Sequence, residues 1–385
     1  MTQAIPGGEN TMPKQTELYL AFELSKREWK LAFSVGGNVR RTGVPARNLD
    51  ALELSIAAAK ERFRLSSATK VRSCYEAGRD GFWLHRWLLG RGIENVVVDS
   101  SSIQVDRRGR QVKTDRVDVG KLLALLVRYW RGERDAWSVL RIPTPEDEDQ
   151  RRPHRELERL KKEETGHRVR IRSLLFLHGI DEPWREDLSE RIATLRNAAG
   201  ELVPLRVQAE IIREQERLLI VRKQYSQLRG ERVARLKAPT DEAATRARQL
   251  VTLVGIGGNS ATVFTQELFG WRRFRNRREV AAAAGLTPTP YFSGDGGREQ
   301  GIAKSGNRRV RRVLVQVAWG WLRYQPNSAI SRWFQERFGH GQGRMRRVGI
   351  VALARKLLIA LWRFVEDGVI PDGALFRANL KEAKW

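Results

Sequence analysis

The sequence is poor in the residues that build disulfides and transition-metal sites. Its 385 residues include one cysteine, Cys74, which excludes a disulfide framework and any thiolate zinc site. The few histidines show no metal-ligand spacing; they are His85, His154, His167, His178 and His340. No apolar run reaches the roughly 18 residues that a membrane helix needs, and the first residues lack the apolar stretch of a secretory signal. These absences predict a cytoplasmic protein with no membrane partner.

Acidic residues are also scarce relative to basic ones, 45 against 71, which gives a formal net charge of +26. Residues 238–385 carry +14 of that excess, whereas residues 1–150 carry only +5. Because self-repulsion of this size opposes a compact state, a polyanionic partner is expected. Apolar residues make up 41% of the chain, enough for a core. The composition therefore predicts a folded nucleic-acid-binding protein.

The first third of the chain predicts strands followed by alternating helices and strands. β-rich runs occupy 18–24, 29–35 and 39–44, and a helix with apolar residues near the 3.6 period spans about 48–64. The predicted elements that follow are strands at 71–76 and 94–99, a helix at about 80–91 and a helix that begins near residue 116. This β-β-β-α-β-α-β-α order indicates an α/β domain of the ribonuclease H type.

Four acidic residues fall at the ends of these predicted elements. Glu23 ends the first strand, Glu76 ends the fourth, and Asp115 and Asp118 flank the start of the last helix. Four carboxylates at one sheet edge would repel one another unless cations lay between them, and magnesium prefers hard oxygen ligands. A pair of magnesium ions at such a site assists phosphoryl transfer. In the alternative interpretation, Asp115 caps the helix and the other three are surface acids.

The middle segment predicts two long antiparallel helices. The first carries a seam in steps of three and four, made of Leu157, Leu160, Ile171 and Leu174 and interrupted by Glu164, His167 and His178. The second, from about residue 202 to 236, is expected to pack through Leu205, Ala209, Ile212 and Leu219. Both a coiled-coil spacer or dimerisation arm and a simple helical linker fit this imperfect seam, in which the histidines are expected as polar residues rather than ligands.

The last third combines a glycine hairpin with dense arginine runs. Gly255, Gly257 and Gly258 join two apolar helical runs, a pattern similar to the helix-hairpin-helix element, whose backbone N–H groups bind phosphate. A plain tight turn is the alternative. Basic residues interleaved with aromatic ones follow, and we expect them to contact nucleic acid. They are Arg272, Arg273, Arg275, Arg277, Arg278, Arg298, Lys304, Arg308, Arg309, Arg311 and Arg312.

Two serines lie in glycine-rich surroundings within this basic region. Ser293 precedes a GDGG tract, and Ser305 lies in a KSGN turn. A hydroxyl surrounded by arginines could attack a phosphodiester, because cations stabilise the charge of the crowded transition state. Serines in glycine loops also commonly form turns, and no neighbouring base is evident.

Several of these segments together resemble the DEDD transposases of the insertion sequence one-ten family, whose elements move DNA between sites in bacteria. The resemblance covers about residues 18–135 and 245–370. It rests on the motifs YEAGRDGFWLHRWL (75–88), DRRGRQVKTDRVDVGKL (106–122), VGIGGNSATVFTQELFGWRRFRNRREVAAAAGLTP (254–288) and SGDGGREQGIAKSGNRRVRRVLVQVAW (293–319).

The resemblance implies a RuvC-like domain with an acidic tetrad and a C-terminal domain with a nucleophilic serine. Carried over, the tetrad falls on Glu23, Glu76, Asp115 and Asp118, and the serine on Ser293. The family's first tetrad position is usually aspartate, whereas this chain has glutamate, which reaches a methylene further. The family also resembles recombinases directed by a structured RNA from the element's end, which pairs with target and donor DNA.

From these observations we predict a mixed fold: a ribonuclease H-like (RuvC-like) α/β domain, a long helical middle and a mostly helical C-terminal domain. The expected divisions are a flexible 1–16, a catalytic domain 17–145, a helical arm 146–240, a transposase domain 241–372 and a tail 373–385. The predicted protein is a magnesium-dependent recombinase that forms a phosphoserine–DNA intermediate and acts as a dimer or tetramer near the bacterial nucleoid. The alternatives are a junction-resolving nuclease that uses water and a non-catalytic nucleic-acid-binding remnant.

Overall fold

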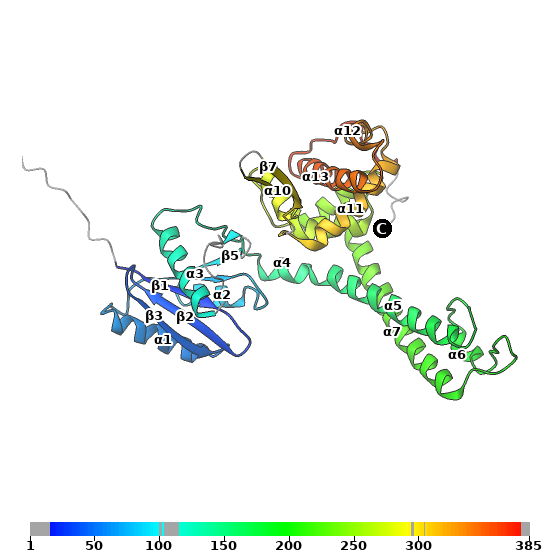
Figure 1. Cartoon of the computed structure of the whole chain (residues 1–385), viewed down its shortest axis with the longest axis horizontal. Helices are drawn as coiled ribbons and strands as arrows, with labels where there is room; N and C mark the ends of the chain where they lie inside the picture. Colours follow the sequence, from blue (N-terminus) through cyan, green and yellow to red (C-terminus); the bar gives the residue numbers. More distant parts are fainter. Residues whose placement is uncertain (1–15, 100–101, 104–114, 294–295, 304, 379–385) are drawn as a thin grey trace, which may run out of the picture. The chain divides into compact units, whose positions relative to one another are not determined.

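A computed structural model describes residues 16–99, 102–103, 115–293, 296–303 and 305–378. The predicted flexible segment 1–16 and the end of the predicted tail lie almost entirely outside these residues. The chain divides into two compact units, residues 1–142 and 143–385, which are described separately. Both are visible in Figure 1.

The first unit is mixed α/β, and its elements follow the predicted order. They are β1 (Leu18–Glu23), β2 (Glu28–Ser34), β3 (Val39–Pro45), α1 (Leu49–Arg62), β4 (Val71–Glu76), α2 (Trp83–Gly90), β5 (Glu94–Val98) and α3 (Asp115–Trp130). The five strands form one sheet in the order β3-β2-β1-β4-β5. β1, β2 and β3 are antiparallel neighbours, whereas β4 and β5 run parallel to β1.

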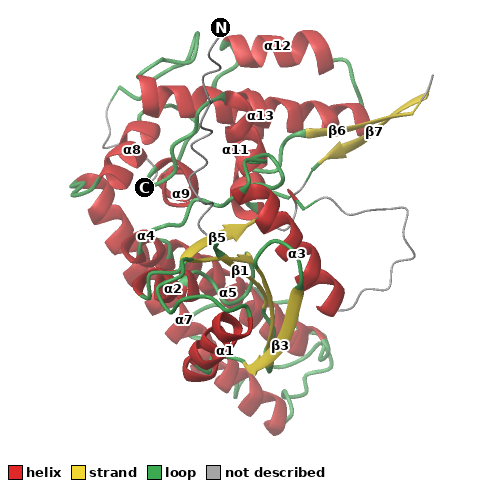
Figure 2. Ribbon diagram, turned by 90° about the vertical axis from the view of Figure 1, so that its left-hand side faces the viewer, coloured by secondary structure: helices red, strands yellow, loops and turns green. Residues whose placement is uncertain are grey.

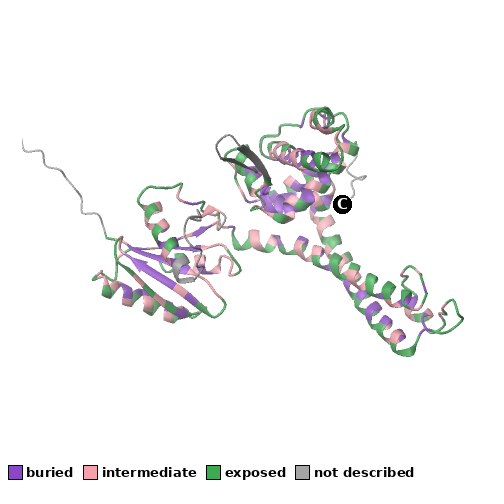
Figure 3. Ribbon diagram, viewed as in Figure 1, coloured by how far each residue is buried: buried purple, intermediate pink, exposed green. Residues whose placement is uncertain are grey.

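Alternation along the strands gives the sheet two apolar faces. Leu18, Leu20 and Phe22 of β1 pack with α1 and α2, while Tyr19 and Ala21 pack with α3. β1 is therefore buried on both faces, as the purple strands in Figure 3 show. Figure 2 shows α3 across the sheet from α1. β1 and β4 are parallel neighbours, so their carboxyl ends lie at the same edge of the sheet, and α3 covers one face beside them.

The second unit is helical apart from one hairpin. Its elements are α4 (Pro145–Gln150), α5 (Arg152–Phe176), α6 (Leu188–Arg191), α7 (Leu205–Lys237), α8 (Glu242–Val251), α9 (Gly258–Phe264), the π-helix η2 (Thr265–Phe269), α10 (Arg277–Ala283), β6 (Pro288–Ser293), β7 (Gly296–Ile302), α11 (Arg308–Tyr324), α12 (Ala329–Phe338) and α13 (Arg344–Asp367). The main core surrounds α13, which buries nine of its residues against α8, α10, α11 and α12.

The predicted pair of long helices is confirmed: α5 and α7 pack side by side and antiparallel, with α6 near their distal end (Figure 1). The predicted seam of α5 is largely correct, since Leu157, Leu160 and Ile171 are buried. The predicted seam of α7 is wrong by one position. Leu205 and Leu219 are exposed, and Ile211, Gln215 and Leu218 are buried instead.

The shifted seam has a polar cause. Buried Gln215 donates to the carbonyl of Glu186 at 2.6 Å, and Glu214 accepts from His167 Nδ1 at 2.6 Å. These bonds engage the Gln215 amide N–H and the Glu214 carboxylate, so the buried face tolerates both residues even though Gln215 Oε1 has no hydrogen-bond partner among the described residues. His167 is therefore a polar seam residue, as the sequence predicts.

Candidate functional site

Glu23 and Glu76 end two neighbouring parallel strands. Phe22 of β1 pairs with Tyr75 of β4, so the two glutamates occupy the next position of the same register. Ala21 and Cys74, two residues earlier, belong to the core beneath α3. Because side chains alternate along a strand, both glutamates lie on the α3 face of the sheet, at its carboxyl edge.

The first turns of α3 reach the same edge. Cys74 Sγ lies 3.9 Å from the carbonyl oxygen of Leu122, and Arg131 beyond the helix lies against Gly36 beside the start of β1, so α3 runs antiparallel to β4. From that contact to Glu76 the strand advances about 6.6 Å, and from Leu122 back to Asp118 the helix advances about 6 Å. The backbone of Asp118 therefore lies level with Glu76, and Asp115 lies one turn further out.

A cavity of about 200 Å³ opens at this edge. It is lined by Phe22, Glu23 and Leu24 from β1 and by residues 75–80 from β4 and the loop after it. Tyr75 holds the loop by donating its hydroxyl to the carbonyl of Gly81 at 3.0 Å. The nearly buried Asp80 carboxylate is paired with Arg79 at 3.2 Å and Arg47 at 3.6 Å.

The donors at this edge are hard carboxylate oxygens, the chemistry that Mg²⁺ prefers. Glu23 and Glu76 would hold it from the sheet, and the side chains of Asp115 and Asp118 lie outside the described ones. Within the described residues no group of three or more His, Cys, Asp or Glu side chains has metal-site geometry. Cys74 is no alternative ligand: burial raises the pKa of its thiol, and the charge of Glu76 adds to the shift.

One acid at this edge was not singled out by the sequence reasoning. Asp99 follows β5, the next parallel strand, and is half-buried. Its backbone N–H donates to the carbonyl of Ser138 at 2.9 Å, which fixes the chain as it leaves the sheet. The signal was available, because the motif ENVVVD ends a predicted strand with an acid just as the first and fourth strands do.

Ser293 is the last residue of β6 and pairs with Gly296 of β7, which places it at the tip of a two-stranded hairpin. The hairpin projects from the helical body in Figure 2. Its root is tightly held: the Ala303 N–H donates to the carbonyl of Thr287 at 2.8 Å, and the Asn307 N–H donates to that of Ala283 at 2.7 Å. Ser293 belongs to the second unit and the acidic edge to the first.

The glycine turn joins α8 to α9, an arrangement that fits both the helix-hairpin-helix prediction and a plain tight turn. Gly255 has a φ of +91°, Gly257 is the N-cap of α9 and Gly258 is buried in its first turn. Arg377 pins the turn by donating to the carbonyls of Leu253 and Ile256 at 2.9 and 3.1 Å. The N-cap makes no side-chain hydrogen bond, so the first N–H groups of α9 depend on other partners.

Several of the predicted nucleic-acid-binding arginines are engaged within the protein. Arg309 and Arg312 both pair with Glu158 of α5, and burial of that carboxylate is outweighed by their hydrogen bonds, which lower its pKa. The other engaged members are Arg273, paired with Glu242 at 2.9 Å, Arg311, donating to the carbonyl of Ala284 at 2.9 Å, and Arg272, 4.6 Å from the ring centroid of Trp271.

The remaining members are better placed for phosphate. Arg275, Arg277, Arg278 and Arg308 are exposed, and among the described residues their guanidinium groups form no ion pair, although the Arg275 backbone N–H donates to Glu279 Oε2 at 3.0 Å. The side chain of Arg298 and the whole of Lys304 lie outside the described part of the chain. The sequence reasoning missed Trp319, which is 40% exposed on α11 with the Arg346 guanidinium 5.5 Å from its ring centroid.

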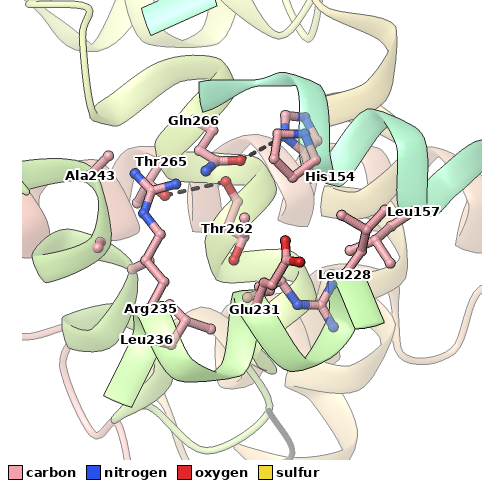
Figure 4. Close-up of a pocket in the computed structure, with 14 residues that line it drawn as sticks. His154, Leu157, Leu228, Glu231, Arg235, Leu236, Ala243, Thr262, Thr265 and Gln266 are labelled. Carbon is pink, nitrogen blue, oxygen red and sulfur yellow. Dashed lines mark hydrogen bonds between the residues drawn. The ribbon is translucent and has the colours of Figure 1, made fainter. Parts of the chain in front are cut away.

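A buried polar cluster joins α5 to the π-helix η2. Figure 4 shows His154 and Gln266 at a cavity of about 160 Å³ lined also by Leu157, Arg235 and Thr262. His154 Nδ1 lies 2.7 Å from Gln266 Oε1, and Nε2 lies 2.8 Å from Glu267 Oε1. Burial alone would raise the pKa of Glu267, but hydrogen bonds from His154 and Arg155 hold it well below its usual value.

An acidic sheet edge in one unit and exposed arginines in the other are the features of a protein that acts on nucleic acid. The profile of the family described as "Transposase IS116/IS110/IS902 family" matches residues 247–332. The putative transposase y4rJ of Sinorhizobium fredii is 40% identical over 375 residues, covering 94% of each chain. The transposase for insertion sequence element IS1328 of Yersinia enterocolitica is 28% identical over 235 residues, covering 59% of this chain and 66% of its own.

The chain belongs to the IS116/IS110/IS902 family of transposases. Members of this family are enzymes that transpose DNA, which agrees with the class that the sequence predicts. In the part of the chain that the structure describes, none of the helices has the length and apolar character needed to cross a membrane.

Proposed function

We propose that the chain excises and inserts its own insertion sequence through a covalent phosphoserine–DNA intermediate. The observation that carries the proposal is the meeting of Glu23, Glu76 and the start of α3 at one edge of the sheet. The element order and the position of these acids support a ribonuclease H-like, RuvC-like assignment of the first unit.

In the proposed reaction Ser293 Oγ loses its proton and attacks a DNA phosphorus. A Ser293 O–P bond forms, the bond between phosphorus and one strand oxygen breaks, and that oxygen leaves as a hydroxyl after taking up a proton. A hydroxyl of the exchanged strand then attacks the same phosphorus and releases the serine. Each step exchanges one phosphoester for another, so the reaction needs no ATP.

At the acidic edge, the carboxylate oxygens of Glu23, Glu76, Asp115 and Asp118 would hold magnesium. Two such ions would supply Lewis-acid stabilisation of the attacking and leaving oxygens. Without such cations the carboxylates would repel one another and the DNA phosphate, so the edge would depend on cations.

Excision of an element-flanked reporter tests the serine. We expect Ser293→Ala to abolish excision and any protein–DNA adduct, while the matched control Ser305→Ala, another serine in the same glycine-rich region, keeps both. Cleavage that survives Ser293→Ala would support the junction-resolving nuclease that uses water. A wild-type protein that shows no strand exchange, and whose Glu76→Gln and Ser293→Ala variants differ from it only by small effects on binding, would be a non-catalytic remnant.

We also propose that an element-encoded RNA guides the reaction, as the resemblance to RNA-directed recombinases implies; the net charge of +26 indicates only that a polyanion is bound. Purification from cells that carry the native flanking DNA, followed by sequencing of bound nucleic acid, tests this. One discrete RNA that maps to the element's end supports guidance; heterogeneous RNA, or none after a high-salt wash, contradicts it.

Exchange of two duplexes needs more than one active site, so we propose a dimer or tetramer that assembles through the α5–α7 arm. The arm exposes Phe176 (64%) and Leu177 (79%) near its distal end. Replacing both with glutamate should lower the sedimenting mass of the protein, and an unchanged mass would place the interface elsewhere.

A further inference from the structure

Glu267 is a fully engaged buried carboxylate on the π-helix η2. Its side chain is 1% exposed. Oε1 accepts from His154 Nε2 and Arg155 Nε, both at 2.8 Å, and Oε2 accepts from Arg155 Nη2 at 2.9 Å and Asn307 Nδ2 at 2.8 Å. A carboxylate has about four lone-pair sites, so these four bonds saturate it. Glu267 is thus a fixed anion that joins other elements, rather than a proton acceptor or a metal ligand.

Asn307 connects this anion to the beginning of α11. It is the N-cap of α11, and its Oδ1 accepts from the backbone N–H of Arg309 at 3.0 Å and of Val310 at 3.2 Å. Its Nδ2 donates to Glu267, so one side chain caps the helix and binds the carboxylate at once. His154 and Arg155 extend the same connection to α5.

The segment tied in this way is the root of the hairpin that carries Ser293. Asn307 also donates its backbone N–H to Ala283, beside the position where the chain enters β6. Gly306 packs against Ala282, Ala283 and Gly285 so closely that a Cβ there would lie 2.2 Å from the Gly285 nitrogen. A two-stranded hairpin is only marginally stable alone, so the position of its tip is set at this root.

We propose that Glu267 is a positioning residue for Ser293: through Asn307 it fastens the hairpin root and the start of α11 to α5. This inference rests on the proposed role of Ser293 as nucleophile. Its chemical basis is geometric, since a displacement of about 1 Å at a reacting group is enough to cost about 100-fold in rate. DNA affinity is expected to change much less than the rate of adduct formation, because Arg275, Arg277 and Arg278 lie outside this root and only Arg308 adjoins Asn307.

Asn307→Ser gives the most selective test, because serine is also a good N-cap but cannot donate as the amide does. Asn276→Ser is the matched control: Asn276 caps α10 with the same pair of bonds, 2.9 and 3.1 Å, and has no bond to Glu267. We expect Asn307→Ser to speed hydrogen exchange of the Ala303 and Asn307-position amides by up to about tenfold, the equivalent of one lost hydrogen bond.

We expect the same variant to lower the rate of adduct formation by about 100-fold while DNA affinity changes by much less. The exchanged pair Glu267→Gln with Asn307→Asp restores a hydrogen bond in the reverse direction, and should form adduct faster than either single variant. Wild-type adduct rates and exchange in Asn307→Ser, or a double variant no better than the singles, would overturn the proposal.

The two proposals fail in different ways. If wild-type protein forms no adduct under conditions that support excision, the nucleophile assignment of Ser293 is wrong, yet the exchange measurement still reports whether Glu267 holds the hairpin root. If wild-type protein forms adduct and Asn307→Ser forms it equally well, the nucleophile stands and the positioning role of Glu267 is wrong.

Discussion

At the residue scale, Glu23 differs from its expected aspartate by one methylene. Glu23 lines the cavity at the end of β1 together with Glu76 and the loop after β4. The charge and the oxygen donors are unchanged, so we expect reach, rather than chemistry, to separate the two residues at this position.

Glu23→Asp should therefore keep excision within about tenfold of wild type, whereas Glu23→Gln should lower it by about a thousandfold, because several kcal/mol of transition-state stabilisation are lost. A reporter excision assay over a range of magnesium concentrations measures both. Equal activity of Glu23→Gln and wild type would exclude a metal-binding role for Glu23.

Glu267 makes stability depend on pH in a definite direction. Its pKa is lowered on folding, so its stabilisation is complete above the ordinary carboxyl pKa of 4.5 and is lost as the pH falls toward the folded value. The melting temperature of the wild-type protein should fall as acid is added below that value, and that of Glu267→Gln should depend less on pH.

At neutral pH we expect Glu267→Gln to destabilise the fold by about 3–5 kcal/mol, because His154 and Arg155 lose their buried counter-charge. Glu158→Gln, in the more exposed part of the same cluster, should destabilise the fold by less than Glu267→Gln. A pH profile of Glu267→Gln that follows the wild type would show that the carboxylate is not ionised in the folded protein.

That Glu23 and Glu76 end neighbouring strands at one edge of the sheet could be predicted, because a strand end is a local property of the sequence. Which arginines pair within the protein could not be predicted. Arg309 and Arg312 pair with Glu158, about 150 positions earlier in the chain, and no local pattern contains that contact. The role of Glu267 could not be predicted for the same reason, because its partners come from α5 and from the N-cap of α11.

At the element scale, the hairpin root depends on a glycine for space. A Cβ at Gly306 would meet backbone atoms, the Gly285 nitrogen and the Ala282 and Ala283 oxygens at 2.2–2.5 Å, which have little freedom to move. We expect Gly306→Ala to cost about 1–3 kcal/mol of stability through overpacking.

The same substitution should lower adduct formation, since the root sets the position of the tip. Ser305→Ala, one residue away and exposed, is the control and should change neither quantity. A Gly306→Ala protein that melts and reacts as the wild type does would mean that the hairpin root is looser than the structure indicates.

The long helices show what periodicity can and cannot determine. The lengths and antiparallel pairing of α5 and α7 follow from their patterns, but α7 carries apolar residues in adjacent pairs, at Ile211 and Ile212 and at Leu218 and Leu219. Each pair offers both faces an apolar residue, so the pattern leaves the buried face undecided. Hydrogen bonds of Glu214 and Gln215 with residues outside α7 select it.

At the scale of the whole molecule, the positive charge is unevenly available. Part of the excess in residues 238–385 is neutralised within the fold, while Arg277 and Arg278 at the start of α10 remain exposed. These two residues should bind phosphate rather than read bases.

Replacing Arg277 and Arg278 with alanine should weaken DNA binding equally for all sequences and reduce the slope of log affinity against log salt by about 0.9 per contact. Arg273→Ala is the matched control, because Arg273 already pairs with Glu242 and should leave the slope almost unchanged. A slope that falls with Arg273→Ala but not with the pair would reverse the assignment.

The central claim is that the acidic edge and Ser293 act in one strand-exchange reaction. The most direct test is to trap the protein during excision, digest it with nuclease and protease, and identify the residue that carries a nucleotide by mass spectrometry. We predict a nucleotide ester on the peptide that contains Ser293 in wild-type protein, and none in Glu76→Gln. Excised DNA with no nucleotide on Ser293, or with an ester that persists in Glu76→Gln, would contradict it.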